Sequence, residues 1–199
     1  MNINKAKTVS LIYGYLNTAT NEEIKDGITW YPDANKIVTD MSILHNIDSF
    51  KCSAVLSALS PANKWQQNIK DCNLVLDSFN NNVHYTDIKV STYHSNKIKA
   101  YNILNNTIQL SYNGSFKTYS FCQNIAYLND NYITLDMWMV RALLNKANHT
   151  FTIKQYETLH KCFKIVSQET GLKVYEIQAV VWVTFRNKFI NKRNIVWSN

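Results

Sequence analysis

The sequence predicts an all-α protein. Apolar residues recur every three or four positions through most of the chain, which is the period of a helix with one buried face. Short polar or proline-containing breaks separate these stretches, and only residues 83–90 alternate weakly in the way a strand would. The length of 199 residues suits one domain, because domains commonly contain about 100–200 residues. We therefore expect a single all-helical domain over residues 1–199.

The N-terminal part predicts two helices. A short helix is expected over residues 9–16, followed by a polar break over residues 17–23. Pro32 suits the first turn of a helix, where its missing N–H has no bond to make. Apolar residues then continue at helical spacing to Leu44, so the second helix is expected to begin around Pro32.

A helical hairpin is expected next. Asp48 or Ser49 should cap a strongly apolar helix. That helix should stop before Pro61, because proline disfavours the α conformation in the residue that precedes it. A short corner at residues 60–63 should then lead into a helix over residues 65–79.

The second half of the chain predicts five more helices. Thr152 and Gln155 match a capping box, and Gly171 should terminate the helix that this box begins. The expected helices lie over residues 98–104, 116–128, 139–144, 156–166 and 177–185. A basic cluster closes the last of them, and its members are Arg186, Lys188, Lys192 and Arg193.

The charge of the chain points to an anionic partner. The formal net charge is +7, carried mostly by lysine, and tyrosine is frequent. A basic surface attracts polyanions such as nucleic acid, in part through counterion release. A composition rich in lysine and asparagine also results from an AT-rich genome, and the sequence leaves both explanations open.

The sequence contains no segment that predicts a membrane span or an export signal. No apolar run approaches the length of about 20 residues that spans a bilayer. The N-terminus, with Asn4, Lys5 and Lys7, lacks the pattern of a signal peptide. We therefore expect a cytoplasmic, monomeric protein that does not bind membranes.

The cysteines and histidines predict neither a metal site nor a cofactor. The four cysteines are widely spaced, and each lies within an apolar helical pattern, so we expect buried free thiols. Neither residue type shows the spacing of a zinc or iron–sulfur site. The residues concerned are Cys52, Cys72, Cys122, Cys162, His45, His84, His94, His149 and His160.

The stretch from Tyr112 to Arg141 carries the strongest functional signal. Asn113-Gly114 predicts a tight turn, because both residue types tolerate φ > 0. The turn opens a helix, and the first amides of a helix have no intrahelical partner, which suits a phosphate. Lys117 in the first turn of that helix would add a positive charge, although a solvated surface lysine is the simpler interpretation.

Asp136 opens the next helix and has two interpretations. The simpler one makes it an N-cap, whose side chain accepts a hydrogen bond from a backbone N–H and contributes about 1 kcal/mol. The other makes it a catalytic carboxylate held beside a phosphate-binding turn. Local patterning leaves both interpretations open.

Four segments, in order along the chain, resemble a known enzyme family. They are Ser49–Ser60, Thr92–Ala100, the turn Asn113–Thr118, and Leu135-Asp136-Met137-Trp138-Met139-Val140-Arg141. Together they resemble the helix-hairpin-helix DNA glycosylases of the endonuclease III type. The third segment is similar to that family's hairpin Gly-x-Gly-x-Lys-Thr, and the fourth to its Val-Asp-Thr-His-Val-x-Arg. This chain departs from the pattern in three ways: one hairpin glycine remains, Trp138 replaces the histidine, and the cluster-binding cysteines of many members are absent.

The resemblance implies an enzyme that flips a damaged or modified base out of DNA and excises it. Extrusion is needed because a stacked base conceals its glycosidic bond. Asp136 would be the catalytic carboxylate that stabilises positive charge on the sugar. Lys117 occupies the place of the lysine nucleophile in members that also cleave the strand, and a plain phosphate contact is its alternative role.

The resemblance also assigns contacts with DNA. The corner at residues 60–63 would fill the gap left by the flipped base, and the Gly114 turn would hold phosphates. Several aromatic residues are candidates for the base pocket, with core packing as the alternative for each. The expected DNA-binding residues are Ser60, Pro61, Asn63, Lys97, Asn113, Gly114, Ser115, Thr118 and Arg141, and the pocket candidates are Trp30, Tyr31, Trp65 and Trp138.

Two other functions stay open at this point. Some phage proteins that resemble glycosylases modify hydroxymethylated pyrimidines in DNA, and the small size and lysine/asparagine bias are compatible with a phage origin. The other is a non-catalytic DNA-binding module in which Asp136 is only a helix cap.

Overall fold

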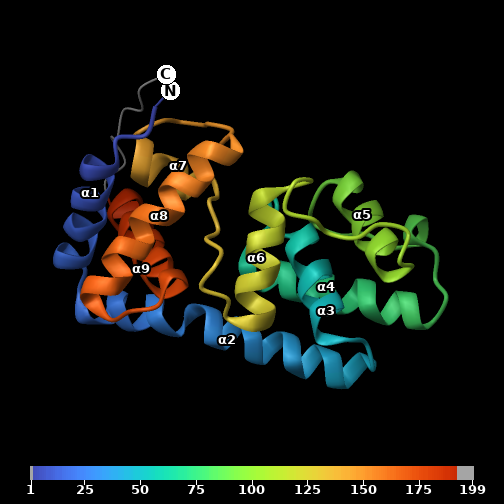
Figure 1. Cartoon of the computed structure of the whole chain (residues 1–199). Helices are drawn as coiled ribbons and strands as arrows, with labels where there is room; N and C mark the ends of the chain where they lie inside the picture. The colour runs from blue at the N-terminus through green and yellow to red at the C-terminus, as the bar shows by residue number, and fades with distance from the viewer. Residues whose placement is uncertain (1, 192–199) are drawn as a thin grey trace. The chain divides into compact units, whose positions relative to one another are not determined.

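The computed structural model describes residues 2–191 and confirms the all-α prediction (Figure 1). Within that range it contains nine α-helices, one short 3₁₀-helix and no β-strand. The described residues form two compact units, residues 2–33 together with 128–191, and residues 34–127. We call them the terminal unit and the central unit, and each is described by itself. The single domain expected from the chain length stays a prediction.

The terminal unit consists of four helices and the first part of a fifth. Helix α9 is at its centre, because α1, α7 and α8 all contact it. Ile177, Val180 and Val181 of α9 are fully buried. The elements are α1 (Lys5–Thr18), α2 (Asn21–His45) as far as Asp33, α7 (Met137–Leu144), α8 (Ile153–Thr170) and α9 (Val174–Asn191).

The start of α2 corrects the sequence prediction. The polar break expected over residues 17–23 is shorter, and the helix begins at Asn21 and not around Pro32. Thr20 and Glu23 form a capping box: Thr20 Oγ1 accepts from the Glu23 amide at 3.2 Å, and Glu23 Oε2 accepts from the Thr20 amide at 2.9 Å. Pro32 therefore lies inside the helix on its exposed side, where it removes one backbone donor.

Gly27 allows α2 to approach α9 closely. A Cβ placed on Gly27 would lie 2.5 Å from the Cα of Val180, a distance that requires the backbone to move. Glycine inside a helix costs about 1 kcal/mol relative to alanine, and this contact explains why it is present here. The N-terminal part of α2 is thereby packed directly against α9.

The central unit is built around α3 (Ser49–Leu59). Residues 52–59 of this helix are all buried, and the helix contacts α4, α5 and α6. Asp48 caps it as predicted, because its Oδ1 accepts from the Lys51 amide at 3.1 Å. The other elements are α2 from Ala34 onward, α4 (Trp65–Asn80), the 3₁₀-helix η1 (Tyr85–Asp87), which takes the place of the doubtful strand, α5 (His94–Leu104) and α6 (Phe116–Tyr127).

Other local predictions are confirmed. Thr152 and Gln155 form the expected capping box of α8, and Gly171 follows the end of that helix with a φ of 75°. All four cysteines are buried free thiols. In the part of the chain that the structure describes, no helix combines the length and apolarity needed to cross a membrane.

Candidate functional site

Asp136 is the N-cap of α7 and also makes a contact beyond its own helix. Its Oδ1 accepts a hydrogen bond from the Met139 amide at 2.9 Å, which confirms the capping interpretation. Its Oδ2 accepts from the indole Nε1–H of Trp182 in α9, also at 2.9 Å. The side chain is half-buried and makes no ion pair within residues 2–191. Each carboxylate oxygen thus has one neutral donor, and no cation among the described residues pairs with it.

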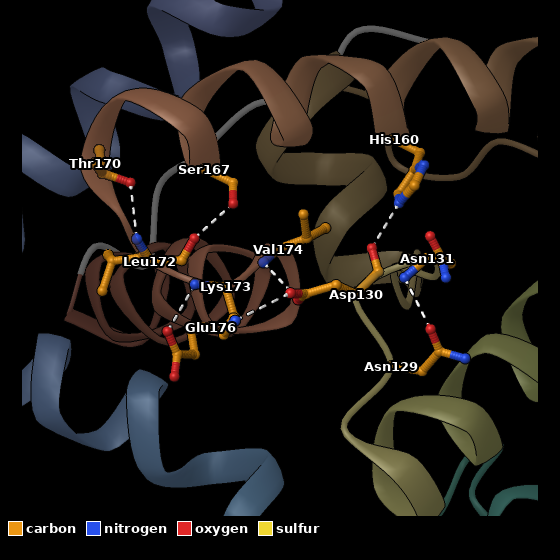
Figure 2. A network of polar contacts seen from close by, with 10 residues as sticks. All are labelled: Asn129, Asp130, Asn131, His160, Ser167, Thr170, Leu172, Lys173, Val174 and Glu176. Atoms are coloured by element: carbon orange, nitrogen blue, oxygen red, sulfur yellow. Dashed lines mark hydrogen bonds and ion pairs between the residues drawn. The ribbon is translucent and has the colours of Figure 1, made fainter.

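The segment that leads to Asp136 is anchored first at Asp130, as Figure 2 shows. Asp130 Oδ1 accepts from the Val174 amide at 2.9 Å, and Oδ2 lies 3.9 Å from Lys173 Nζ. The backbone carbonyl of Asp130 accepts from His160 Nε2 at 3.0 Å. Burial lowers the pKa of His160, which favours the neutral ring that donates this bond. Asp130 therefore caps α9 from a segment far away in the sequence.

A second anchor lies at Ile133. The Tyr156 hydroxyl accepts from the Ile133 amide at 3.0 Å and donates to the Ile133 carbonyl. Ile133, Thr134 and Leu135 are all buried. Because Thr134 and Leu135 are buried directly before Asp136, this packing holds the backbone that leads to the carboxylate.

Two of the predicted pocket aromatics lie close to this carboxylate. Tyr31 is 2% exposed, and its hydroxyl donates to Gln178 Oε1 at 2.7 Å. Burial raises the pKa of Tyr31, and the negative charge of Asp136 adds to that rise. Tyr31 is thus packed in the core of the terminal unit, and its assignment to a base pocket stays a prediction. Trp30 is half-buried, with its ring centroid 4.8 Å from that of Tyr31 and 6.4 Å from that of Trp182.

Arg141 and Trp138 form a cation–aromatic stack on α7. The guanidinium Cζ of Arg141 lies 4.9 Å from the Trp138 ring centroid and 6.0 Å from that of Phe189. Trp138 in turn contacts Phe185 and Phe189 edge-on. Trp138 therefore provides an aromatic surface for the Arg141 guanidinium, three positions further along the same helix.

The predicted turn before α6 is present, but its amides donate hydrogen bonds within the turn. The amides of Gly114 and Ser115 both donate to the Ser111 carbonyl at 3.2 Å, and the Gly114 amide also lies 3.2 Å from Ser111 Oγ. Neither Asn113 nor Gly114 has a positive φ. The glycine is favoured for another reason, because a Cβ would lie 3.0 Å from Ser111 Oγ. The expected cradle of outward-pointing amides is thus corrected at these two positions.

Ser115 and Thr118 are also engaged with each other. Ser115 Oγ accepts from the Thr118 amide at 3.4 Å and donates to Thr118 Oγ1 at 3.0 Å. Thr118 is 8% exposed, so its hydroxyl faces inward and its predicted contact with DNA is corrected. Lys117 is half-buried at the second position of α6.

The corner between α3 and α4 is fixed by a buried carboxylate that the sequence did not reveal. Asp71 is 3% exposed. Its Oδ2 accepts from Asn63 Nδ2 and the Ser91 amide, and its Oδ1 accepts from Gln67 Nε2, each at 2.8 Å. Asn63 therefore points inward, which corrects its predicted role in filling a gap in DNA.

The remaining corner residues are also bonded within the chain. Ser60 Oγ donates to the Ser57 carbonyl at 2.9 Å, and the Pro61 carbonyl accepts from Thr92 Oγ1 at 2.6 Å. Ala62 is exposed and has a φ of 56°, a conformation that costs a residue with a Cβ about 1 kcal/mol. The corner is thus rigid, with Pro61 and Ala62 as its outer residues.

Lys97 and Trp65 complete the set of predicted residues. Lys97 is 7% exposed, and its Nζ donates to the Ile88 carbonyl at 2.7 Å. It ties the segment after η1 to α5, which corrects its assignment as a DNA contact. Trp65 is half-buried at the first position of α4. Of the predicted C-terminal basic cluster, Lys192 and Arg193 lie outside the described residues.

The predicted site residues are divided between the two compact units. Asp136 caps α7, and Trp138 and Arg141 lie on that helix in the terminal unit, whereas Lys117 and the Gly114 turn belong to the central unit. Trp182 and Asp71 were missed, because their partners are distant in the sequence and no local pattern marks them. Within residues 2–191, no group of three histidine, cysteine or acidic side chains could hold a metal ion.

Comparison with known proteins gives a family but no described relative. Residues 1–189 match a family model described as a family of unknown function (DUF7178). The match takes in α1 to α8 and most of α9. No curated protein and no solved structure matches the chain.

Proposed function

The chain belongs to this family of unknown function, and from the geometry around Asp136 we propose that it is a DNA glycosylase-like enzyme. It would flip a damaged or modified base out of DNA and excise it. The observation that carries the proposal is the half-buried carboxylate of Asp136, which is held by donors from α7 and α9 and has no ion-pair partner among residues 2–191. A helix cap needs only the first of these two bonds.

The chemistry requires negative charge near the sugar. As the N-glycosidic bond breaks, positive charge develops on the sugar ring, and a fixed carboxylate stabilises it without reorganising. A carboxylate has about four lone-pair sites, and Asp136 uses two of them within the protein. The remaining capacity is available to the sugar or to an attacking water molecule, which the same carboxylate could orient or deprotonate.

DNA binding would rest on charge. The net charge of +7 favours a polyanion, and Lys173–Asp130 is the one ion pair within the described residues. Exposed basic side chains would contact phosphates, and these contacts would weaken as salt rises. The free energy of these contacts would offset the cost of extruding the base from the stack, which is a few kcal/mol.

The first test removes the charge of Asp136 and keeps its shape. We expect Asp136→Asn to retain the cap on Met139, because asparagine caps helices as well as aspartate does. Base release from a panel of duplexes with damaged or hypermodified bases should fall at least about 100-fold, the loss typical of removing one electrostatic stabiliser. Asp48→Asn is the matched control, because Asp48 caps α3 through the same kind of bond. Equal rates for Asp136→Asn and the wild type would reject the role of Asp136.

The second test addresses Lys117. If its amine attacks the sugar and forms a Schiff base, borohydride should trap a covalent adduct with DNA that carries an abasic site. The adduct should disappear in Lys117→Ala and persist in Lys70→Ala, which removes an exposed lysine of α4. An adduct that persists in Lys117→Ala would assign the nucleophile elsewhere.

A non-catalytic DNA-binding module is the second candidate. It is favoured by the same two hydrogen bonds, since both oxygens of Asp136 already have a partner. In that case Asp136→Ser, which preserves the cap, should bind DNA as the wild type does, and no base should be released by either protein. An altered nucleoside in treated DNA, seen by mass spectrometry, would instead indicate base modification.

A further inference from the structure

The indole of Trp182 contacts two side chains of opposite charge. Its Nε1–H donates to Asp136 Oδ2 at 2.9 Å. The guanidinium of Arg186 lies over the indole ring, with its Cζ atom 4.8 Å from the ring centroid. The carboxylate thus lies at the edge of the ring and the guanidinium lies over its face, and all three residues belong to the terminal unit.

Arg186 keeps its hydrogen-bonding groups available. Its side chain is exposed and makes no ion pair within the part of the chain that the structure describes. A cation–π contact is an electrostatic attraction and does not require the five N–H donors of the guanidinium. The indole therefore holds the cation in place and leaves those donors to a ligand.

We propose that Arg186 binds a phosphate of the DNA strand whose sugar reaches Asp136, and that Trp182 positions both side chains. The part that concerns the sugar rests on the proposed function, and the part that concerns the phosphate does not. A guanidinium matches a phosphate through two parallel N–H···O bonds. A phosphodiester adjoins every sugar of the strand. The Trp182 ring would therefore set the spacing between Arg186, which binds the phosphate, and Asp136, which meets the sugar.

A second stack on the same pair of helices favours a polymer over a single anion. Arg141 lies 4.9 Å from the Trp138 ring centroid, and α7 and α9 contact each other. Two guanidinium groups held on aromatic rings suit a ligand with repeated phosphates, in agreement with the net charge of +7. A free phosphate offers the same chemistry as one phosphate of DNA, and the test below separates them.

Arg186→Gln in the full chain tests the phosphate contact. The loss of one contact should reduce the slope of log K against log[salt] by about one and weaken DNA binding about eightfold at 0.1 M salt. Lys164→Gln is the matched control, because it removes an exposed cation of α8 and should leave the slope unchanged. Displacement of the DNA by inorganic phosphate at constant ionic strength would overturn the assignment to a nucleic-acid backbone.

Trp182→Phe tests the positioning role separately. Phenylalanine retains a ring beneath Arg186 but lacks the N–H that Asp136 accepts. We expect an unchanged salt slope and at least about a tenfold slower base release at saturating DNA, as for a lost bond to a charged group. Unchanged release by this variant would overturn the positioning role.

The two proposals fail in different ways. Equal salt slopes for wild type and Arg186→Gln would overturn the phosphate site even in a protein that releases bases. A reduced slope in a protein that releases no base would support the phosphate site and reject the glycosylase activity.

Discussion

Asp71 in the central unit and Asp136 in the terminal unit hold their carboxylates in different ways. Neither makes an ion pair within the described residues. Asp71 is 3% exposed and accepts three hydrogen bonds, which come from the corner, from α4 and from the loop before α5. Asp136 is half-buried and accepts two, from α7 and α9.

The difference separates a structural carboxylate from one suited to chemistry. Asp71 is enclosed and bonded to three donors, so its charge serves to join three parts of the central unit. Asp136 is held by two donors, and the residue is half-buried rather than enclosed. Burial and the number of donors, more than residue type, thus indicate which aspartate can meet a ligand.

The largest expected effect on stability comes from Asp71→Ala. The change removes the acceptor of three part-buried hydrogen bonds, which come from the Ser91 amide and two side-chain amides. Each such bond contributes about 1 kcal/mol. We expect the free energy of unfolding to fall by about 3 kcal/mol in urea denaturation. Asp77→Ala, at an exposed position of the same helix, should change it by less than about 0.5 kcal/mol. Similar losses in the two variants would contradict the structural role of Asp71.

Asp136→Ala should have an intermediate effect. It removes a cap, worth about 1 kcal/mol, and leaves the Trp182 indole N–H without its partner, at a further cost of about 1 kcal/mol. Asp48→Ala removes a cap alone and should cost about 1 kcal/mol. If urea denaturation gives the same loss for both, the bond from Trp182 contributes nothing to stability.

The smallest effect is expected from the anchor at His160. Burial lowers the pKa of His160 in the folded protein below its ordinary value of 6.5, so the unfolded chain takes up the proton first. The stability that the neutral ring contributes is therefore present above pH 6.5 and is lost as the pH falls toward the lowered folded pKa. His160→Gln, which can still donate to the Asp130 carbonyl, should lose less stability between neutral and mildly acidic pH. Equal losses in wild type and variant would show that this anchor is insensitive to pH.

Local interactions were predictable from the sequence. Asp48, Asp136 and Thr152 cap the helices that they precede, because a cap involves residues two or three positions apart. Apolar periodicity predicted most helices, because it too depends on residues only three or four positions apart. The start of α2 differs from the prediction, because the capping box of Thr20 and Glu23 begins the helix and Pro32, which also suits a first turn, lies inside it.

The candidate site could be predicted only in part. Asp136 was proposed from its motif, but its partner Trp182 lies 46 positions away in the sequence. Asp71 accepts hydrogen bonds from residues on both sides of it, up to 20 positions away in the sequence. Lys97 and Asn63 looked suited to DNA, yet their polar ends face inward. The direction of a side chain depends on packing against distant segments, which one sequence does not specify.

The most direct test of the central claim is the single-turnover rate of base release by Asp136→Asn relative to wild type, measured on the duplex that the wild type processes best. If the Asp136 carboxylate stabilises charge on the sugar, the rate should fall at least about 100-fold with DNA affinity unchanged. A rate close to that of the wild type, in a variant that is folded and binds DNA, would contradict the claim and leave Asp136 as a helix cap.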